Sequence, residues 1–301
     1  MSRRTVGHLM QSSAMALAHL GGDALLALDV PDGVLAAEAE AVTVERGERY
    51  AVARGLAVVP VRGLLTPNMF AFERWMGWTT YQGLEQSMAE LSANEDCSGI
   101  VLDMDTPGGM VRGIQGAADA IAAAAQVKPV HVLVNPLSAS AGYWLAAQGS
   151  DITMTPGSDV GSIGVRLMAS APVKADNWGD KWFEISSSNA RAKNPDPSTE
   201  AGMAELLRSL DESEAAFHAA VASGRGINPA DLAAQLSVTG DPQDGGAVFQ
   251  SDQAIARGLA DSAETREAFY ARIAETYAPA PRQQPRAYAK LAAAAQARAT
   301  T

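Results

Sequence analysis

Two serines stand close together in a segment that could support nucleophilic catalysis. The segment Ser138-Ala-Ser-Ala-Gly-Tyr-Trp144 lies between an expected strand and an expected helix. A serine in such a position can be exposed over a helix N-terminus, where the next backbone N–H can stabilise an oxyanion. Ser140 is the better candidate, because Ala141 and Gly142 after it allow a substrate carbonyl to approach closely. The alternative is that both serines are turn and N-cap residues, and this segment alone favours that alternative.

A proline followed by two glycines could supply the second part of an acyl-transfer site. In Thr106-Pro-Gly-Gly109, the two glycines can present backbone N–H groups that no side chain obstructs. An oxyanion hole, or a cradle for an extended peptide, requires such groups. Pro-Gly-Gly is also an ordinary turn, so the motif is weak when taken alone.

A serine nucleophile needs a base, and the histidines are poorly placed for that role. His131 alternates within an apolar strand, and the other three histidines lie in expected helices far along the chain. A lysine can act as a base only when neutral, which requires an apolar pocket that lowers the pKa of a lysine to about 7 to 8. We favour Lys193, although spacing alone leaves Lys181 level with it. The five lysines are Lys128, Lys174, Lys181, Lys193 and Lys290.

The elements that must position these residues alternate between strand and helix. Apolar runs predict strands over 58–65, 99–105 and 129–134, and helical spacing or composition predicts helices over 84–91, 113–126 and 140–148. This βαβ order predicts an α/β fold with a mostly parallel sheet. Ligand sites in such sheets lie beyond the strand C-termini, where both the 106–109 and the 135–140 segments are expected as loops.

The flanks of this central region have a different character. Residues 1–50 are predicted to be a helical and loop segment, 51–276 the main domain, and 277–301 a basic, proline-broken tail that is disordered or ordered by a partner. A long helix is expected to start with Asp196 as its cap and to end before Gly224. We interpret it as a packing or oligomer helix, because one face is apolar: Met203, Leu206, Leu207, Leu210, Phe217 and Val221.

Composition limits the class of protein. The chain has 301 residues, of which 47% are apolar and 19% charged, which is typical of a globular protein. The net charge of -11 makes a nucleic-acid-binding role improbable. The single cysteine cannot form an internal disulfide, which predicts a reducing compartment. No two histidines have the spacing of metal ligands, so we expect neither a metal ion nor a cofactor. No apolar run is long enough to cross a membrane, and His19 and Asp23 interrupt a leader-like stretch at 1–28.

In this order and separation, four segments resemble the signal peptide peptidase A family of serine proteases, and within it the phage prohead (capsid maturation) proteases. Asp105-Thr-Pro-Gly-Gly109 resembles the oxyanion loop of the family, with Thr106 in place of the usual serine. The other three of these segments are the nucleophile block Ser138–Tyr143, the block Val160–Val165 that contains Ser162, and the lysine block Ser186–Asp196. A fifth segment, Gly245–Asp261, is similar to the C-terminal signature of the family.

The resemblance implies a crotonase-like and Clp-protease-like α/β superhelix that assembles as a homo-oligomer, in which the lysine can come from a neighbouring protomer. It implies that Ser140 is the nucleophile, Lys193 the base and Ser162 the residue that supports Lys193. The implied oxyanion hole consists of backbone N–H groups around Gly108, Gly109 and Ala141. Arg191-Ala192 precede the lysine where the phage block usually has Pro-Asn.

The implied function is that of a Ser-Lys endopeptidase that cleaves capsid or scaffold proteins during phage head maturation in the host cytoplasm. Its expected partners are that protein substrate and further copies of the chain, without nucleic acid or membrane. Two alternatives remain open at this point. One is a housekeeping peptidase that clears signal peptides, and the other is a non-catalytic capsid assembly or scaffold protein.

Overall fold

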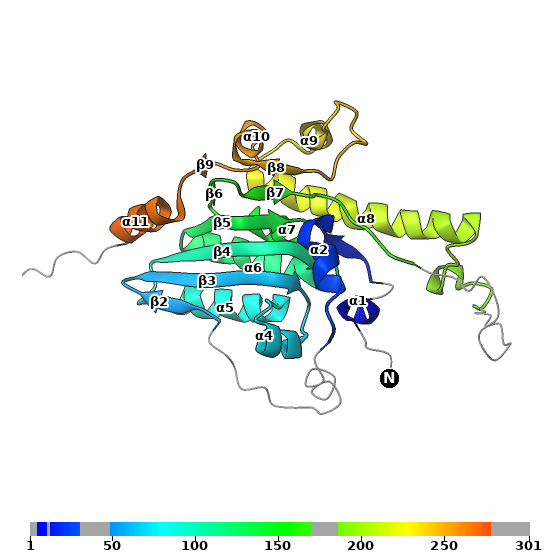
Figure 1. The fold of residues 1–301 in the computed structure, drawn as a ribbon, viewed down its shortest axis with the longest axis horizontal. Helices are drawn as coiled ribbons and strands as arrows, with labels where there is room; N and C mark the ends of the chain where they lie inside the picture. Colours follow the sequence, from blue (N-terminus) through cyan, green and yellow to red (C-terminus); the bar gives the residue numbers. More distant parts are fainter. Residues whose placement is uncertain (1–4, 11–12, 31–48, 170–185, 278–301) are drawn as a thin grey trace, which may run out of the picture.

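The computed structural model describes residues 5–10, 13–30, 49–169 and 186–277, and its centre is a nine-stranded sheet (Figure 1). The main path of this sheet runs in the order β2-β3-β4-β5-β6-β9, with β1, β7 and β8 attached beside it. The strands are β1 (Met15–Leu17), β2 (Ala51–Ala53), β3 (Leu56–Leu65), β4 (Gly99–Met110), β5 (Val130–Ala139), β6 (Asp151–Met154), β7 (Asp159–Gly161), β8 (Val248–Gln250) and β9 (Ser262–Ala263).

The long strands of the sheet are parallel. β3, β4, β5, β6 and β9 pair in parallel along the path, and β7 also pairs in parallel with the last residues of β5. The antiparallel pairs are peripheral: β2 with β3, β1 with β4, and β7 with β8. The predicted α/β fold with a mostly parallel sheet is confirmed.

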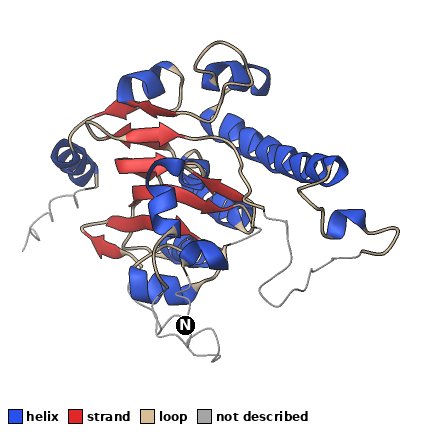
Figure 2. Cartoon of the chain, turned by 45° about the vertical axis from the view of Figure 1, so that its right-hand side comes forward, coloured by secondary structure: helices blue, strands red, loops and turns tan. Residues whose placement is uncertain are grey.

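Helices lie on both sides of the sheet (Figure 2). Alternate residues of β4 point to opposite faces: Ile100, Leu102 and Met104 join the main core with α5 and α6, whereas Val101 joins a smaller cluster with α11. The helices are α1 (Val6–Leu9), α2 (His19–Leu26), α4 (Phe70–Met76), α5 (Tyr81–Ala93), α6 (Ile114–Val127), α7 (Ala141–Ala146), α8 (Glu200–Arg225), α9 (Pro229–Leu236), α10 (Ser251–Ala256) and α11 (Arg266–Thr276), with a 3-10 turn at Arg191–Lys193.

The strands extend further than their local sequence predicts. β4 continues through the expected turn at 106–109, and β5 continues through the expected loop at 135–140 as far as Ala139. Pairing with other segments extends both strands. Residues 108–110 of β4 pair with β1, and Gly108 and Gly109 also pair with the end of β3, whereas residues 137–139 of β5 pair with β7. β1 itself lies in the N-terminal segment, which was expected to contain helix and loop without a strand.

The long helix α8 begins later than expected. Its N-cap is Thr199, whose Oγ1 accepts a hydrogen bond from the Gly202 N–H at 3.0 Å. Asp196 instead accepts from the Ser198 N–H at 2.8 Å, within a turn that precedes the helix. A Cβ on Gly202 would lie 1.9 Å from the Asp196 carbonyl oxygen, so this turn packs directly on the first turn of α8. The prediction that Asp196 caps the helix is therefore wrong.

The two halves of α8 have different surroundings. Phe217 and Val221 in the second half are buried, and the Phe217 ring stacks on that of Trp144 in α7 with the centroids 4.5 Å apart. Met203 and Leu207 in the first half are 44% and 51% exposed. Figure 1 shows this first half projecting beyond the sheet. One helix therefore provides a packing face and an uncovered apolar surface.

Phe217→Ala is expected to lower the free energy of unfolding by about 3 to 5 kcal/mol, because it leaves a cavity against the Trp144 ring. Denaturant unfolding measures this change. Leu207→Ala, on the exposed half of the same helix, is the matched control and should cost little. Equal effects of the two substitutions would contradict the packing of α8 on α7.

Among the described residues, no helix has the length and apolar character needed to cross a bilayer. The predicted tail at 277–301 lies outside the described residues except for Tyr277, and Lys174 and Lys181 also lie outside them.

Candidate active site

Ser140 occupies the turn between β5 and α7. Its backbone has φ 55° and ψ -119°, a strained conformation for a residue with a side chain. Its N–H donates to the Gly161 carbonyl at 2.7 Å, and its carbonyl accepts from the Trp144 N–H at 2.9 Å. A serine on a sharp, strained strand-to-helix turn is the geometry of a nucleophile elbow.

The glycine loop at the end of β4 lies directly beside this serine. Gly108 has φ +111°, and a Cβ on it would lie 3.0 Å from both the Ser140 Cβ and the Ala141 nitrogen. A Cβ on Gly109 would lie 2.0 Å from the Leu65 carbonyl oxygen. Both positions therefore require glycine, and the fold brings Gly108, Gly109 and Ala141 together at Ser140.

Thr106 holds the glycine loop in place. Its hydroxyl donates to the Gly63 carbonyl at 2.6 Å and accepts from the Gly108 N–H at 3.1 Å, and the residue is fully buried. The threonine thus provides the hydroxyl of the serine that is usual at this position. Because the Gly108 N–H is already engaged, Gly109 and Ala141 are the better candidates for oxyanion donors.

Thr106→Val is expected to destabilise the protein by about 1 to 3 kcal/mol, because the buried Gly63 carbonyl loses its donor. It should also lower activity by loosening the glycine loop. Thr106→Ser retains the hydroxyl and is the matched control. Thermal unfolding and peptide cleavage measure both effects, and a valine variant as stable as the serine variant would show that the hydroxyl does not support the loop.

Ser138 is fully buried next to α7, because a Cβ on Gly142 would lie 3.6 Å from its Oγ. Among the described residues, this Oγ has no hydrogen-bond partner and therefore no base to activate it. Of the two serines in the segment, the structure therefore favours Ser140.

Ser162 follows β7 and lies next to the backbone that supports Ser140. It has φ 52°, and its N–H donates to the Ala247 carbonyl at 2.7 Å. The preceding residue, Gly161, supplies the carbonyl that accepts from the Ser140 N–H. The fold therefore brings the predicted supporting serine into the same region as the predicted nucleophile.

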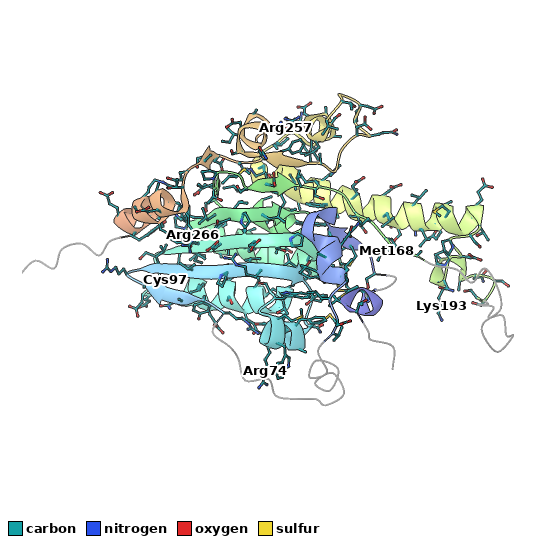
Figure 3. The ribbon with its side chains drawn as sticks, viewed as in Figure 1. Arg74, Cys97, Met168, Lys193, Arg257 and Arg266 are labelled. Atoms are coloured by element: carbon teal, nitrogen blue, oxygen red, sulfur yellow. The ribbon has the colours of Figure 1, made fainter. Side chains whose placement is uncertain are left out.

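Lys193 lies far from this group. It is exposed in the 3-10 turn before α8, and Figure 3 shows it below the projecting first turns of that helix, away from the sheet. From Glu200 to Phe217, which packs on α7, the helix axis spans about 25 Å at 1.5 Å per residue. The structure does not bring Lys193 to Ser140 within one chain.

The other described candidates for a base have structural partners. Lys128 donates from Nζ to the carbonyls of Leu91 and Asn94 at 2.7 and 2.6 Å, where it caps the end of α5. His131, at the start of β5, contacts the Asp151 carboxylate at 2.6 Å and the Tyr277 hydroxyl at 2.8 Å. Neither side chain is available to Ser140 at the other end of β5.

Residues of the segment 245–261 support α7, the helix that follows Ser140. The Tyr143 hydroxyl donates to the Leu259 carbonyl at 2.8 Å, and burial raises the pKa of this phenol well above its usual range. The Asp261 carboxylate accepts from the Ile152 N–H and from the Arg225 guanidinium, at 2.7 and 2.6 Å. Burial raises the pKa of Asp261, but these hydrogen bonds outweigh burial and lower it below its usual value.

Within the described ranges, no group of three or more potential ligands is arranged to hold a metal ion.

The sequence analysis missed one feature at this site. The short strand β1 pairs with the glycine loop, at Gly108 and Gly109, and so lies against the candidate nucleophile. Its sequence, Met15-Ala-Leu17, has only three residues and no turn motif that marks it as a strand. Its partner strand is more than ninety positions away along the chain, so no local signal could have revealed the pairing.

Comparison with known proteins assigns the chain to a family. Residues 122–278 match the model of peptidase family S49, and the chain belongs to that family. The chain is 34% identical over 221 residues to capsid assembly protease C of Escherichia phage lambda, which covers 70% of this chain and 47% of the relative. These findings confirm the predicted family and its phage branch.

Two further comparisons cover different shares of the chain. The chain is 36% identical over 118 residues to head-tail preconnector protein GP5 of Enterobacteria phage P21, across 39% of this chain and 24% of that protein. It thus spans about half the length of the lambda relative and a quarter of the P21 relative. An enoyl-CoA hydratase/isomerase family member of known structure aligns at 18% identity and a TM-score of 0.40, covering 77% of this chain and 76% of that one.

Proposed function

We propose that the protein is a serine endopeptidase that cleaves capsid or scaffold proteins during phage head maturation in the host cytoplasm. The observation that carries the proposal is the strained Ser140 turn beside the Gly108–Gly109 loop, in a chain of peptidase family S49. The lambda relative, whose name describes a capsid assembly protease, supports the choice of substrate.

In the proposed reaction, Ser140 Oγ attacks the peptide carbonyl while Lys193 takes the hydroxyl proton. The N–H groups of Gly109 and Ala141 stabilise the oxyanion. Lys193 then gives the proton to the departing amine, and Ser162 orients the lysine. Water, activated by the same lysine, releases the acyl group and restores Ser140.

The position of Lys193 favours a dyad that is completed by a second copy of the chain. Lys193 lies at the projecting end of α8, which also carries the exposed apolar side chains Met203 and Leu207. An apolar surface of this kind is suited to association with another protomer, and a closed ring would bring each Lys193 to the Ser140 of a neighbour. We therefore infer a homo-oligomer in which the lysine acts on the adjacent chain.

Two alternatives to this proposal are a housekeeping peptidase and a non-catalytic assembly protein. The phage relatives favour head maturation over a housekeeping peptidase that clears signal peptides. A non-catalytic assembly role draws some support from the preconnector name of the P21 relative. Normal head assembly with the Ser140→Ala variant would favour the non-catalytic role.

Fluorophosphonate labelling followed by peptide mapping tests the proposal directly. The label should be recovered on Ser140 in the wild-type protein and be absent from Ser140→Ala. Co-expression with the capsid and scaffold proteins of the same phage provides the substrate test. A label on any other serine, or uncleaved capsid and scaffold proteins, would contradict the proposed function.

A further inference from the structure

The candidate nucleophile is covered in this structure. Ser140 is 1% exposed, and Gly108 and Gly109 beside it are also buried. A nucleophile of a protease must meet a peptide bond from outside, so whatever covers Ser140 must leave before a substrate can bind. β1, a segment of the same chain, pairs with the glycine loop directly beside Ser140.

One edge of β1 pairs with the glycine loop. The two strands are antiparallel, with Ala16 opposite Gly109. The residue pairs two positions to either side of this one, Ala14 with Val111 and Ala18 with Pro107, are hydrogen-bonded. The Val111 N–H donates to the Ala14 carbonyl at 3.0 Å, and the Ala18 N–H donates to the Pro107 carbonyl at 2.8 Å. Because bonded pairs alternate in an antiparallel ladder, Ala16 and Gly109 form the bonded pair between them. The Gly109 N–H, a candidate oxyanion donor, therefore faces the Ala16 carbonyl.

The other edge of β1 pairs with the chain after Ser162. The Met15 N–H donates to the Arg166 carbonyl, and the Arg166 N–H donates to the Met15 carbonyl, both at 2.9 Å. β1 thus lies between two backbone segments and is hydrogen-bonded on both sides. Main-chain groups arranged in this way accept any extended peptide, because strand addition uses no side chain for pairing.

The Ala16 carbonyl lies close to Gly108, on the glycine loop that adjoins Ser140 and Ala141. A Cβ on Gly108 would be 2.2 Å from the Ala16 oxygen and 3.0 Å from both the Ser140 Cβ and the Ala141 nitrogen. The Ala16 side chain is fully buried in the cluster that contains Ala141, whereas Met15 and Leu17 on either side join a different apolar cluster. The space beside Ser140 therefore suits a small side chain.

We propose that Met15–Ala18 occupies the peptide-binding position next to Ser140 and competes with substrate for it. The site accepts an extended peptide with a small residue, such as alanine, at the position of Ala16. This inference rests on the proposed function for the nature of the substrate. An exposed ion pair between Asp23 and Arg166, at 2.6 Å, helps to hold the segment in place and weakens as salt rises.

A reversible disulfide can lock β1 in place. Met15 and Met110 are opposite each other in a non-bonded pair of the ladder, where Cα atoms are about 4.5 Å apart. This separation falls in the range of about 4.4 to 6.8 Å that a disulfide requires. The protein used is the full chain with Met15→Cys, Met110→Cys and Ser140→Ala. The native Cys97 is buried and separate from this pair.

The probe is a fluorescent peptide with the sequence of residues 13–19, and its binding is measured by anisotropy. Oxidation should weaken peptide binding at least tenfold, and a reducing agent should restore it. The two single-cysteine variants are the controls and should not respond to oxidant. Equal binding to the oxidised and reduced protein would overturn the proposal.

A second variant opens the site instead of closing it. Met15→Pro removes the N–H that donates to Arg166 and should tighten peptide binding at least tenfold. Leu28→Ala, at an exposed position of the same N-terminal segment, is the matched control and should leave binding unchanged. Unchanged binding in a folded Met15→Pro protein would also overturn the proposal.

These measurements separate this inference from the proposed function. Peptide binding in the Ser140→Ala background needs no catalysis, so a lock that controls binding supports the inference even in a protein that cleaves nothing. Conversely, if the double-cysteine protein with Ser140 intact cleaves peptide equally well when oxidised and reduced, the inference fails and the proposed function stands.

Discussion

Ser140→Ala is expected to abolish peptide cleavage and to leave the fold intact. Loss of a nucleophile lowers kcat by many orders of magnitude, here on the order of 10⁴-fold or more. The substitution removes one oxygen from a turn whose backbone hydrogen bonds, to Gly161 and from Trp144, remain. Cleavage of a short peptide measures the first effect, and thermal unfolding measures the second.

Ser138→Ala is the matched control for this prediction. The Ser138 hydroxyl is buried without a hydrogen-bond partner among the described residues, so its removal should leave activity unchanged. The free energy of unfolding should stay the same or increase, because a buried, unpaired polar group costs about 1 to 3 kcal/mol. An inactive Ser138→Ala and an active Ser140→Ala would make Ser138 the nucleophile.

Mixing two inactive variants is expected to restore activity. Ser140→Ala lacks the nucleophile and Lys193→Ala lacks the base, so each alone should be inactive. If Lys193 acts on a neighbouring chain, random co-assembly of equal amounts restores both groups in about one quarter of the sites. The exposed position of Lys193, in the turn before the projecting end of α8 and away from the sheet, is the reason to expect this result. Peptide cleavage by the mixture, compared with wild type, measures it.

Two controls accompany the mixing experiment. Lys128→Ala should retain activity, because Lys128 caps α5 and is not part of the site. The Ser140→Ala/Lys193→Ala double variant should be no less active than either single variant, because the two groups act as a unit. A mixture that assembles but remains inactive would mean that the dyad forms within one chain, after the segment around Lys193 moves.

Local sequence determined the order and type of the central elements. The apolar runs at 99–105 and 129–134 and the helical spacing between them predict the parallel β4 and β5 with α6 between, because side-chain burial has a period that can be read from one segment. Ser140 is also found where its neighbours predict, at a strand-to-helix turn. The order of the motifs was enough to identify the family.

Tertiary structure decided how the site is completed. The expected turn at 106–109 became strand because β1, more than ninety positions away, and the end of β3 both pair with it, and such pairing leaves no trace in the local pattern. Ser140 beside it is buried, although the sequence places it at an exposed turn. The distance between Lys193 and Ser140 likewise depends on where α8 packs, through Phe217 on Trp144. Pattern and spacing predict which residues do the chemistry, whereas long-range packing determines which of them meet within one chain.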